Sequence, residues 1–269
     1  MVRLEILDQD AIEEALDEGR LDLLFTNPSH YVQVRSENPL TGALATLISL
    51  EDGQPTDQLG GVIIARDDTE AVEELADLRG RHIGVPGMRY PGGFQTQAFE
   101  LQQAGVRLPN DAEVTELGGH DQVVESILAG EVEYGFVRTG IIESLTREGK
   151  IDPARLQVIH ARDVPEFPYR VSTRLYPEWA FVALPRVERH HVHRISSSLL
   201  ALDADHPVSR AAGIAGFAPP GTICRWRTSP GTCVCRPLTI AFRWRCSGRT
   251  IAGWPWPPWW RSAPPPCGC

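Results

Sequence analysis

Short apolar runs alternate with helix-like segments along most of this chain, and that alternation limits the possible folds more than any other feature. The apolar runs span about four to eight residues, and Gly61–Ala65 is rich in the branched side chains that strands favour. The segments between them carry apolar side chains at helical spacing. This order predicts an α/β fold with parallel-rich sheets that helices cover on both faces. We expect strands over residues 4–7, 21–25, 61–65, 81–85, 114–117, 134–137 and 156–160, and helices over 8–19, 71–78, 94–104, 122–129 and 141–147.

The composition changes abruptly after Pro220. Residues 221–269 contain no Asp, Glu or Lys, and they hold all six cysteines, six of the seven tryptophans and seven arginines. The tail therefore has a net charge of +7. Because the whole chain has a net charge of −9, the body has a net charge of −16. An acidic body argues against nucleic acid as a partner. The cysteine spacing matches no standard zinc pattern and no catalytic motif is present, so we expect no metal, no cofactor and no catalytic residue.

The tail has the composition of a reading frame displaced by two bases. Because Trp is TGG and Pro is CCN, the displaced codons of Trp254–Trp260 would alternate Leu or Val with Ala-like residues. The displaced frame can hold about 17 apolar residues in a row, close to the ~20 that a membrane helix needs. We therefore expect residues 221–269 to be disordered and out of frame, and the parent protein to have a membrane anchor. The alternatives for this tail are metal binding and binding to nucleic acid or a membrane surface, and the DNA sequence across the Pro220 codon decides between them.

Ligands of such sheets bind where strands end and helices begin, and four polar loops fit that place. They cover residues 26–31, 87–95, 118–121 and 137–140. In the second loop, Gly92 and Gly93 precede a helix. Exposed N–H groups and the helix dipole there suit an anion, and a tight turn is the alternative reading.

The polar residues of these loops each have a structural alternative. His120 is expected to face a cleft while Asp121 caps the following helix, rather than the two forming an acid–base pair. His30 is equally a ligand contact or a packed core residue. Arg138 is equally a ligand contact or a surface salt bridge. The histidines of His190–His193 lie in a polar helical stretch, which favours a solvated face over a metal site.

A resemblance to a known family rests on the order of several segments over residues 2–220. These are TNPSHY, GVIIARDD, LADLRGRHIGVP, GGFQTQAFEL, GGHDQVVESILAGEVEYGFVRTGIIESL and STRLYPEWAFVALP. In this order they resemble the phosphonate-binding-protein-like (PhnD-like) family of periplasmic solute-binding proteins. The segments STRLYPEW and AAGIAGFAPP resemble, within that family, the sensor domains of membrane-bound histidine kinases such as tetrathionate sensors.

The resemblance implies two α/β lobes, joined by crossover strands, that close on a ligand in a cleft between them. Lobe one would be residues 1–66 plus 172–220, and lobe two residues 67–171. The family has a strand and helix ahead of the point where Met1 stands, so we expect an N-terminal truncation that leaves lobe one incomplete. The chain opens without a signal peptide, so it would stay cytoplasmic although the parent faces the periplasm.

The resemblance also implies the ligand contacts and the role. The ligand-binding candidates, with His30 added from the loop itself, are Asn27, His30, Tyr31, Tyr90, Gly92, Gly93, Phe94, Gln95, His120, Asp121, Arg138, Thr139 and Tyr169. The implied function is a non-enzymatic sensory domain for a small polar or anionic solute, as a fragment of a two-component sensor histidine kinase that can act as a dimer. The alternatives are the substrate-binding protein of a phosphate- or phosphonate-type ABC transporter, and a small-molecule enzyme on the same fold.

Overall fold

The computed structural model describes residues 3–220 apart from residues 39, 41, 52 and 71. The expectations for residues 221–269, including the displaced frame and the disorder, lie outside the described residues. No helix in the described ranges combines the length and the apolar character that crossing a membrane requires.

The first sheet is built around the long strand β2 (Gly42–Glu51), and every pair in it is antiparallel. Its order is β1-β11-β2-β12, and β3 forms a hairpin with β2. The remaining strands are β1 (Leu23–Thr26), β3 (Gln54–Thr56), β11 (Ala180–Ala183) and β12 (Ile214–Ala218). The helices beside it are α1 (Gln9–Asp17), α2 (Pro28–Glu37), α6 (Arg189–Leu200) and α7 (Pro207–Ala212). Helices α1 and α2 share an apolar core with β1 and β11, whereas α6 contacts β2 and β12.

The second sheet has the order β7-β6-β8-β5-β9 and mixes strand directions. Strand β6 runs parallel to β7 and β8, whereas β5 runs antiparallel to β8 and β9. Its strands are β5 (Gly61–Arg66), β6 (His82–Val85), β7 (Glu113–Glu116), β8 (Tyr134–Arg138) and β9 (Leu156–Ile159). Its helices are α3 (Thr96–Gln103), α4 (His120–Ala129) and α5 (Ile141–Arg147).

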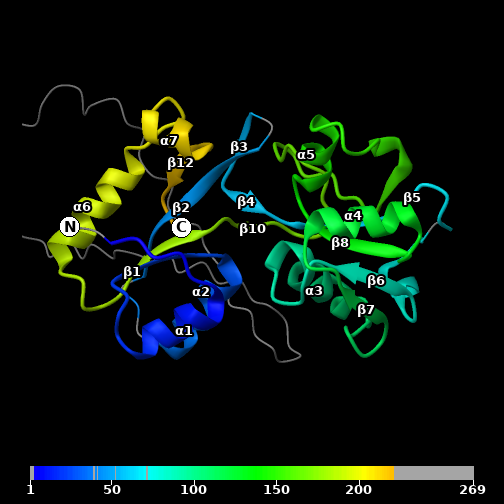
Figure 1. Cartoon of the computed structure of the whole chain (residues 1–269), viewed down its shortest axis with the longest axis horizontal. Helices are drawn as coiled ribbons and strands as arrows, with labels where there is room; N and C mark the ends of the chain where they lie inside the picture. Colours follow the sequence, from blue (N-terminus) through cyan, green and yellow to red (C-terminus); the bar gives the residue numbers. More distant parts are fainter. Residues whose placement is uncertain (1–2, 39, 41, 52, 71, 221–269) are drawn as a thin grey trace, which may run out of the picture. The chain divides into compact units, whose positions relative to one another are not determined.

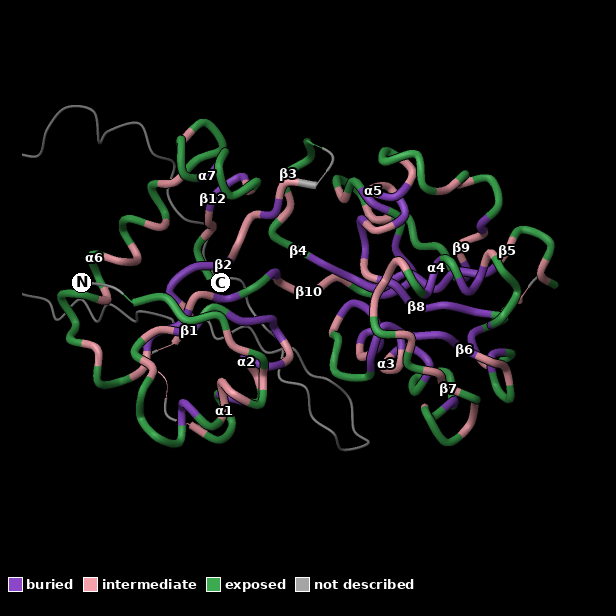
Figure 2. Tube along the Cα trace, viewed as in Figure 1, coloured by how far each residue is buried: buried purple, intermediate pink, exposed green. Residues whose placement is uncertain are grey.

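Both faces of the second sheet are buried. Successive side chains of a strand point to opposite faces, so Ile63 and Ala65 lie on one side of β5 and Val62 and Ile64 on the other. The first pair belongs to a core that includes residues of α3, and the second pair to a core that includes residues of α4 and α5. Figure 2 shows that the central strands of this sheet are buried along their length. Burial on both faces explains the continuous apolar run GVIIA.

Two short strands connect the sheets, β4 (Gln58–Leu59) and β10 (Tyr176–Pro177), and they pair antiparallel with each other (Figure 1). Strand β4 leads from the first sheet into β5, and β10 leads back into β11. Next to them the backbone N–H of Gly60 donates to the hydroxyl of Thr139 at 3.1 Å, and the N–H of Thr139 donates to the carbonyl of Gly60 at 3.1 Å. These two hydrogen bonds join the residue that follows β4 to the residue that follows β8.

The strand directions differ from the parallel-rich sheets that the sequence predicts. Parallel pairing is confined to the contacts of β6, and the first sheet is antiparallel. The reason is that the chain crosses between the sheets twice, so β5 and β11 enter their sheets against the direction of their neighbours. Alternation of strands and helices does not reveal such crossings.

Two expected elements do not form. Residues 4–7 are not a strand, and Leu4 and Ile6 are 84% and 92% exposed. No strand pairs with them among the described residues, and an isolated strand leaves its backbone groups without partners. Of the helix expected over 71–78, the described residues 72–78 form only the 3-10 turn η1 (Leu75–Leu78), which follows a capping box at Glu74.

The boundary expected between the lobes at residue 66 differs from the sheet pairing. Strand β5 covers Gly61–Arg66 and pairs with β8 and β9 in the second sheet. The first lobe therefore gives way to the second at β4, ahead of Gly61. The sequence of a buried strand does not indicate which sheet the strand joins.

Candidate functional site

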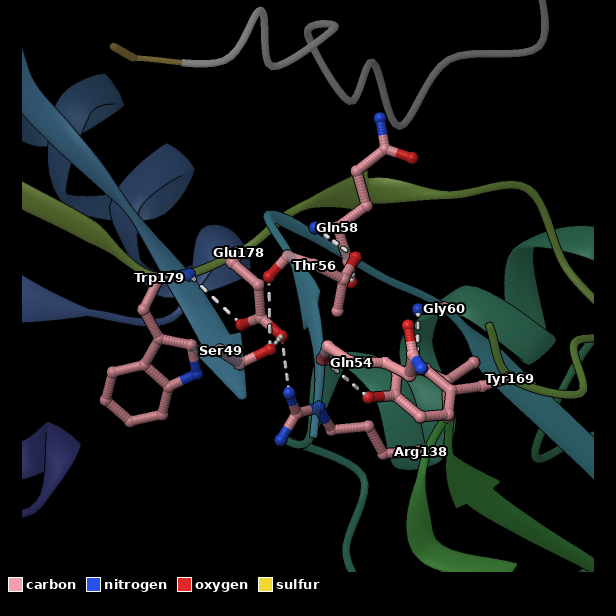
Figure 3. A network of polar contacts seen from close by, with 10 residues as sticks. Ser49, Gln54, Thr56, Gln58, Gly60, Arg138, Tyr169, Glu178 and Trp179 are labelled. Carbon is pink, nitrogen blue, oxygen red and sulfur yellow. Dashed lines mark hydrogen bonds and ion pairs between the residues drawn. The ribbon is translucent and has the colours of Figure 1, made fainter. Parts of the chain in front are cut away.

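Arg138 is the last residue of β8, opposite Gly61 of β5, and its side chain joins residues of both sheets. Its guanidinium donates to the carboxylate of Glu178, which lies between β10 and β11. The Arg138 side chain is 27% exposed and the Glu178 side chain 0%. Figure 3 shows the two side chains directed at each other beside the hairpin of β2 and β3. The sequence offered Arg138 as a ligand contact or a surface salt bridge, and the structure gives it a buried partner.

The Glu178 carboxylate accepts its other hydrogen bonds from Ser49 of β2 and from the next backbone N–H in the chain. Its Oε1 accepts from the Ser49 hydroxyl at 3.5 Å, and its Oε2 accepts from the backbone N–H of Trp179 at 3.3 Å. The single proton of the Ser49 hydroxyl is shared with the carbonyl of Thr56 at 3.1 Å. A buried carboxylate is tolerated where a cation and hydrogen-bond donors surround it, and these contacts meet that need. Glu178 was missed in the sequence, where it carries no signal apart from its place in the PEW segment.

His120 is the first residue of α4 and lies next to Arg138. Its Nδ1 accepts from the backbone N–H of Arg138 at 3.4 Å, and the Tyr90 ring meets the imidazole edge-on with 5.9 Å between centroids. Burial and, as the smaller cause, the positive charge of Arg138 together lower the pKa of His120 to about 4, while Asp121 opposes the shift. The ring is therefore neutral near pH 7, and with Nδ1 accepting, Nε2 carries the proton and can donate.

The shifted pKa of His120 predicts a pH dependence of stability. Because the folded-state pKa lies below the ordinary 6.5, the unfolded chain binds a proton that the folded chain does not, from about pH 6.5 down to about pH 4. The free energy of unfolding should fall as the pH falls through that window, by about 1.4 kcal/mol per pH unit. Urea unfolding at several pH values measures it.

The control for that measurement is His120→Asn, which removes the titrating ring. Burial also lowers the pKa of His30 and gives a slope of the same sign, so the part due to His120 is the difference between wild type and variant. Equal slopes for the two proteins between pH 6.5 and 4 would contradict the assignment.

Gly92 and Gly93 lie in a π-type turn, η2 (Pro91–Gln95), which packs closely on Arg138 and His120. A Cβ at Gly92 would lie 2.8 Å from Cγ of Arg138, and one at Gly93 would lie 2.8 Å from Cε1 of His120. Real Cβ atoms do not approach other atoms so closely, so both positions require glycine. This favours the tight-turn reading over an anion cradle, and it brings the turn against both polar side chains.

Gln97 holds that turn to β8 and was not among the predicted residues. Its side chain is 0% exposed, and Nε2 donates to the carbonyls of Gly92 at 2.7 Å and Val137 at 3.0 Å. The Thr96 hydroxyl donates to the Gln97 Oε1 at 2.9 Å. A buried amide with partners at both ends fixes the spacing of turn and strand.

Three of the predicted residues serve the first sheet and α2. Asn27 is the N-cap of α2, and its side-chain oxygen accepts from the N–H of His30 at 3.0 Å. His30 is 2% exposed and its Nδ1 lies 2.7 Å from the Thr26 hydroxyl, which favours the packed-core reading. Tyr31 is 4% exposed in the core of α1, α2, β1 and β11. The sequence signal for ligand contact at these positions is equally a capping signal.

Other predicted residues divide between the second lobe and the crossovers. Phe94 is buried in the core of the second sheet, and Thr139 bonds Gly60 as described above. Half-buried Gln95 has its amide 3.5 Å from the Arg89 carbonyl. The hydroxyl of buried Tyr169 donates to the carbonyl of Gln54 at 3.1 Å.

The capping role expected for Asp121 is wrong. The N-cap of α4 is Gly119, with no side-chain cap, and Asp121 is the second helical residue. Its carboxylate lies 3.5 Å from the Lys150 ammonium. At that position an acidic side chain still interacts favourably with the helix dipole. Of the thirteen predicted residues, the structure thus gathers Arg138, His120, Tyr90, Gly92 and Gly93.

Two cavities in the described part of the chain lie away from these residues. The larger, about 440 Å³, is lined by Ile48, Pro55, Thr56, Asp57, Gln58, Pro165, Glu166 and Phe167. The other, about 360 Å³, is lined by Ile142, Glu143, Thr146, Arg147, Pro153 and Arg170. None of the thirteen predicted residues lines either one, although Thr56 of the larger cavity contacts Ser49 of the Glu178 network.

The chain forms two β-sheets with their flanking helices, and two crossover strands join them. Polar side chains meet beside these strands, which is the architecture of a two-lobed solute-binding domain. The chain belongs to the family of periplasmic substrate-binding proteins of phosphonate ABC transporters, whose model matches residues 1–221. This confirms the fold class and the family resemblance.

A curated relative agrees with that assignment, and two solved structures share the fold. The tetrathionate sensor histidine kinase TtrS of Salmonella typhimurium (strain LT2) is 30% identical over 198 residues, which are 73% of this chain and 33% of the kinase. The chain thus spans about a third of that relative's length. XAC2383 from Xanthomonas citri bound to ATP aligns over 80% of this chain and 77% of its own at a TM-score of 0.63. PhnD1 from Prochlorococcus marinus (MIT 9301) in complex with methylphosphonate aligns over 80% and 78% at a TM-score of 0.57. Both structures are 15% identical to this chain and show the fold alone.

Proposed function

We propose that this chain is the ligand-sensing domain of a membrane-bound sensor histidine kinase and that it binds a small oxyanion at Arg138. The observation that carries the proposal is the meeting of Arg138, at the end of a sheet strand, with His120 at the start of α4. Strand ends beside helix starts are where ligands of α/β sheets bind.

The chemistry of the three side chains suits an oxyanion. The Arg138 guanidinium has five N–H donors in a planar fork, which matches the oxygens of sulfur and phosphorus oxyanions. Neutral His120 adds a donor without adding charge, and Tyr90, at 48% exposure, adds a hydroxyl at the rim. The start of α4 contributes backbone N–H groups and the positive end of its dipole.

The sensor role is supported by the relative that shares most of the chain. The tetrathionate sensor kinase is 30% identical to this chain over 198 residues, which are 73% of the chain. We infer that the parent protein is membrane-anchored, that its binding domain faces the periplasm and that it works as a dimer. Ligand binding would shift an equilibrium between open and closed lobes, which the rest of the parent converts into kinase activity.

A transporter role is the second candidate, and the family itself favours it. The matching family model describes substrate-binding proteins of phosphonate transporters, and the PhnD1 structure contains methylphosphonate. The two roles share the binding chemistry and differ in the ligand. Tetrathionate and methylphosphonate are therefore the ligands to compare.

Calorimetric titration of the full 269-residue chain with tetrathionate and with methylphosphonate tests the proposal. One of the two should bind, and Arg138→Lys should weaken that binding at least tenfold, because lysine keeps a cation for Glu178 but lacks the donor fork. The matched control is His191→Asn on the exposed face of α6, which should bind like the wild type. Absence of binding to both ligands, or equal affinity in the Arg138 variant, would falsify the proposal.

A further inference from the structure

Glu178 is a fully buried carboxylate whose charge is balanced from the opposite lobe. Among the described residues its cation is Arg138, and its remaining partners are the neutral Ser49 hydroxyl and the Trp179 N–H. The carboxylate has 0% exposure, so water does not screen it as it screens a surface ion pair. The interaction of its charge with anything near the guanidinium is therefore strong.

Among the described residues, two further carboxylates near the proposed site are exposed and screened. Asp121 is next to His120 but pairs with Lys150, and both side chains are about half exposed. Asp10 pairs with Arg89 from the same loop as Tyr90, with both side chains about 70% exposed. Exposed pairs of this kind contribute little at physiological salt. Glu178 is the carboxylate that an anion at Arg138 would meet without intervening water.

The pair of Arg138 and Glu178 has no net charge, which changes what the site can bind. An anion that approaches the guanidinium is attracted by Arg138 and repelled by the carboxylate behind it. The repulsion grows in proportion to the charge of the ligand. Full transfer of Arg138 to the ligand would also leave the Glu178 carboxylate buried without a cation, which is strongly unfavourable.

We propose that Glu178 is a specificity-determining residue that selects against doubly charged anions by competing with the ligand for the Arg138 guanidinium. This rests on the proposed binding of an oxyanion at Arg138 and adds to it the charge that the site prefers. Without a ligand, the Glu178 carboxylate binds the guanidinium that a ligand anion would otherwise bind. The preferred ligand is then singly charged, or carries its charges far enough apart that one of them is remote from Glu178.

Sulfate and methanesulfonate test this, because they are tetrahedral anions of similar size that carry two charges and one. In Glu178→Gln the affinity should rise about threefold for methanesulfonate and about tenfold for sulfate, since the Coulomb energy doubles with the charge. Titrations of the full chain, followed by NMR of the amides of residues 119–121 and 138–139, give both constants. The control is Asp22→Asn, which removes one negative charge from the exposed pair with Arg186. It should change neither constant by more than about twofold.

A second variant covers failure of Glu178→Gln to fold. Glu178→Asp keeps the charge but withdraws it by one methylene, so the sulfate affinity should rise by a smaller factor with the same order of preference. An unchanged ratio of the two affinities in every folded Glu178 variant, or no binding of either anion, overturns the proposal. If tetrathionate or methylphosphonate still binds through Arg138 in that case, the proposed function stands and only the charge selection fails.

Discussion

Replacing Arg138 by methionine should lower the free energy of unfolding by about 3–5 kcal/mol. The reason is Glu178, which has 0% exposure and whose cation among the described residues is Arg138. Methionine fills the space of the arginine stem but leaves the carboxylate charged, buried and uncompensated. Urea unfolding at pH 7, followed by far-UV circular dichroism, gives the difference directly.

The double variant Arg138→Met/Glu178→Gln shows how much of the lost stability comes from the unpaired charge and how much from the changed packing. It removes both charges, so it should recover more than half of the stability that the single variant loses. The same double variant should not bind the oxyanion, because the guanidinium is absent. A single variant that loses less than about 1 kcal/mol would show that the pair is solvated like a surface salt bridge.

Replacing Phe136 by alanine should also cost about 3–5 kcal/mol, and for an unrelated reason. Phe136 is 0% exposed on β8, opposite Ile63 of β5, in the core that includes residues of α3. Truncation removes the ring contacts and leaves a cavity that the two neighbouring strands cannot fill. Because Arg138 lies two residues further along the same strand, anion affinity should fall together with the stability of β8.

Phe136→Leu is the matched control for that truncation. Leucine keeps most of the apolar volume, so it should cost no more than about 1.5 kcal/mol and leave anion affinity close to that of wild type. If alanine and leucine destabilise equally, the core around β8 is not closely packed. Thermal unfolding of both variants together with the oxyanion titration measures the two effects on one sample.

Local sequence was enough where local contacts decide the structure. Helix α5 covers the expected residues 141–147, and α4 ends at Ala129 because Gly130 takes the left-handed conformation that closes a helix. Helix α1 begins after Asp8, whose side chain accepts from the N–H of Ala11. The apolar run of Gly61–Arg66 likewise becomes a strand buried on both faces. Each of these depends on residues close together in the chain.

The candidate site could be predicted only in part, because its contacts join residues that are far apart in the chain. Arg138 and His120 stand at recognisable strand ends and helix starts, so their positions followed from the alternation of elements. The partner of Arg138 could not be predicted, because Glu178 lies 40 residues away in the sequence, in the segment between β10 and β11 that leads into the first sheet. For the two glycines the sequence left both an anion site and a tight turn open, and their distances to neighbouring side chains favour the turn.

The sequence by itself determined an α/β chain with an acidic body, a compositional break at Pro220, and the polar loops at its strand ends. Only the tertiary structure decided the strand directions, the sheet that β5 joins, the failure of residues 4–7 to form a strand, and the pairing of Arg138 with Glu178. The physical reason is that a strand or a buried charge is stable only with its partner, and the partners here come from distant parts of the chain.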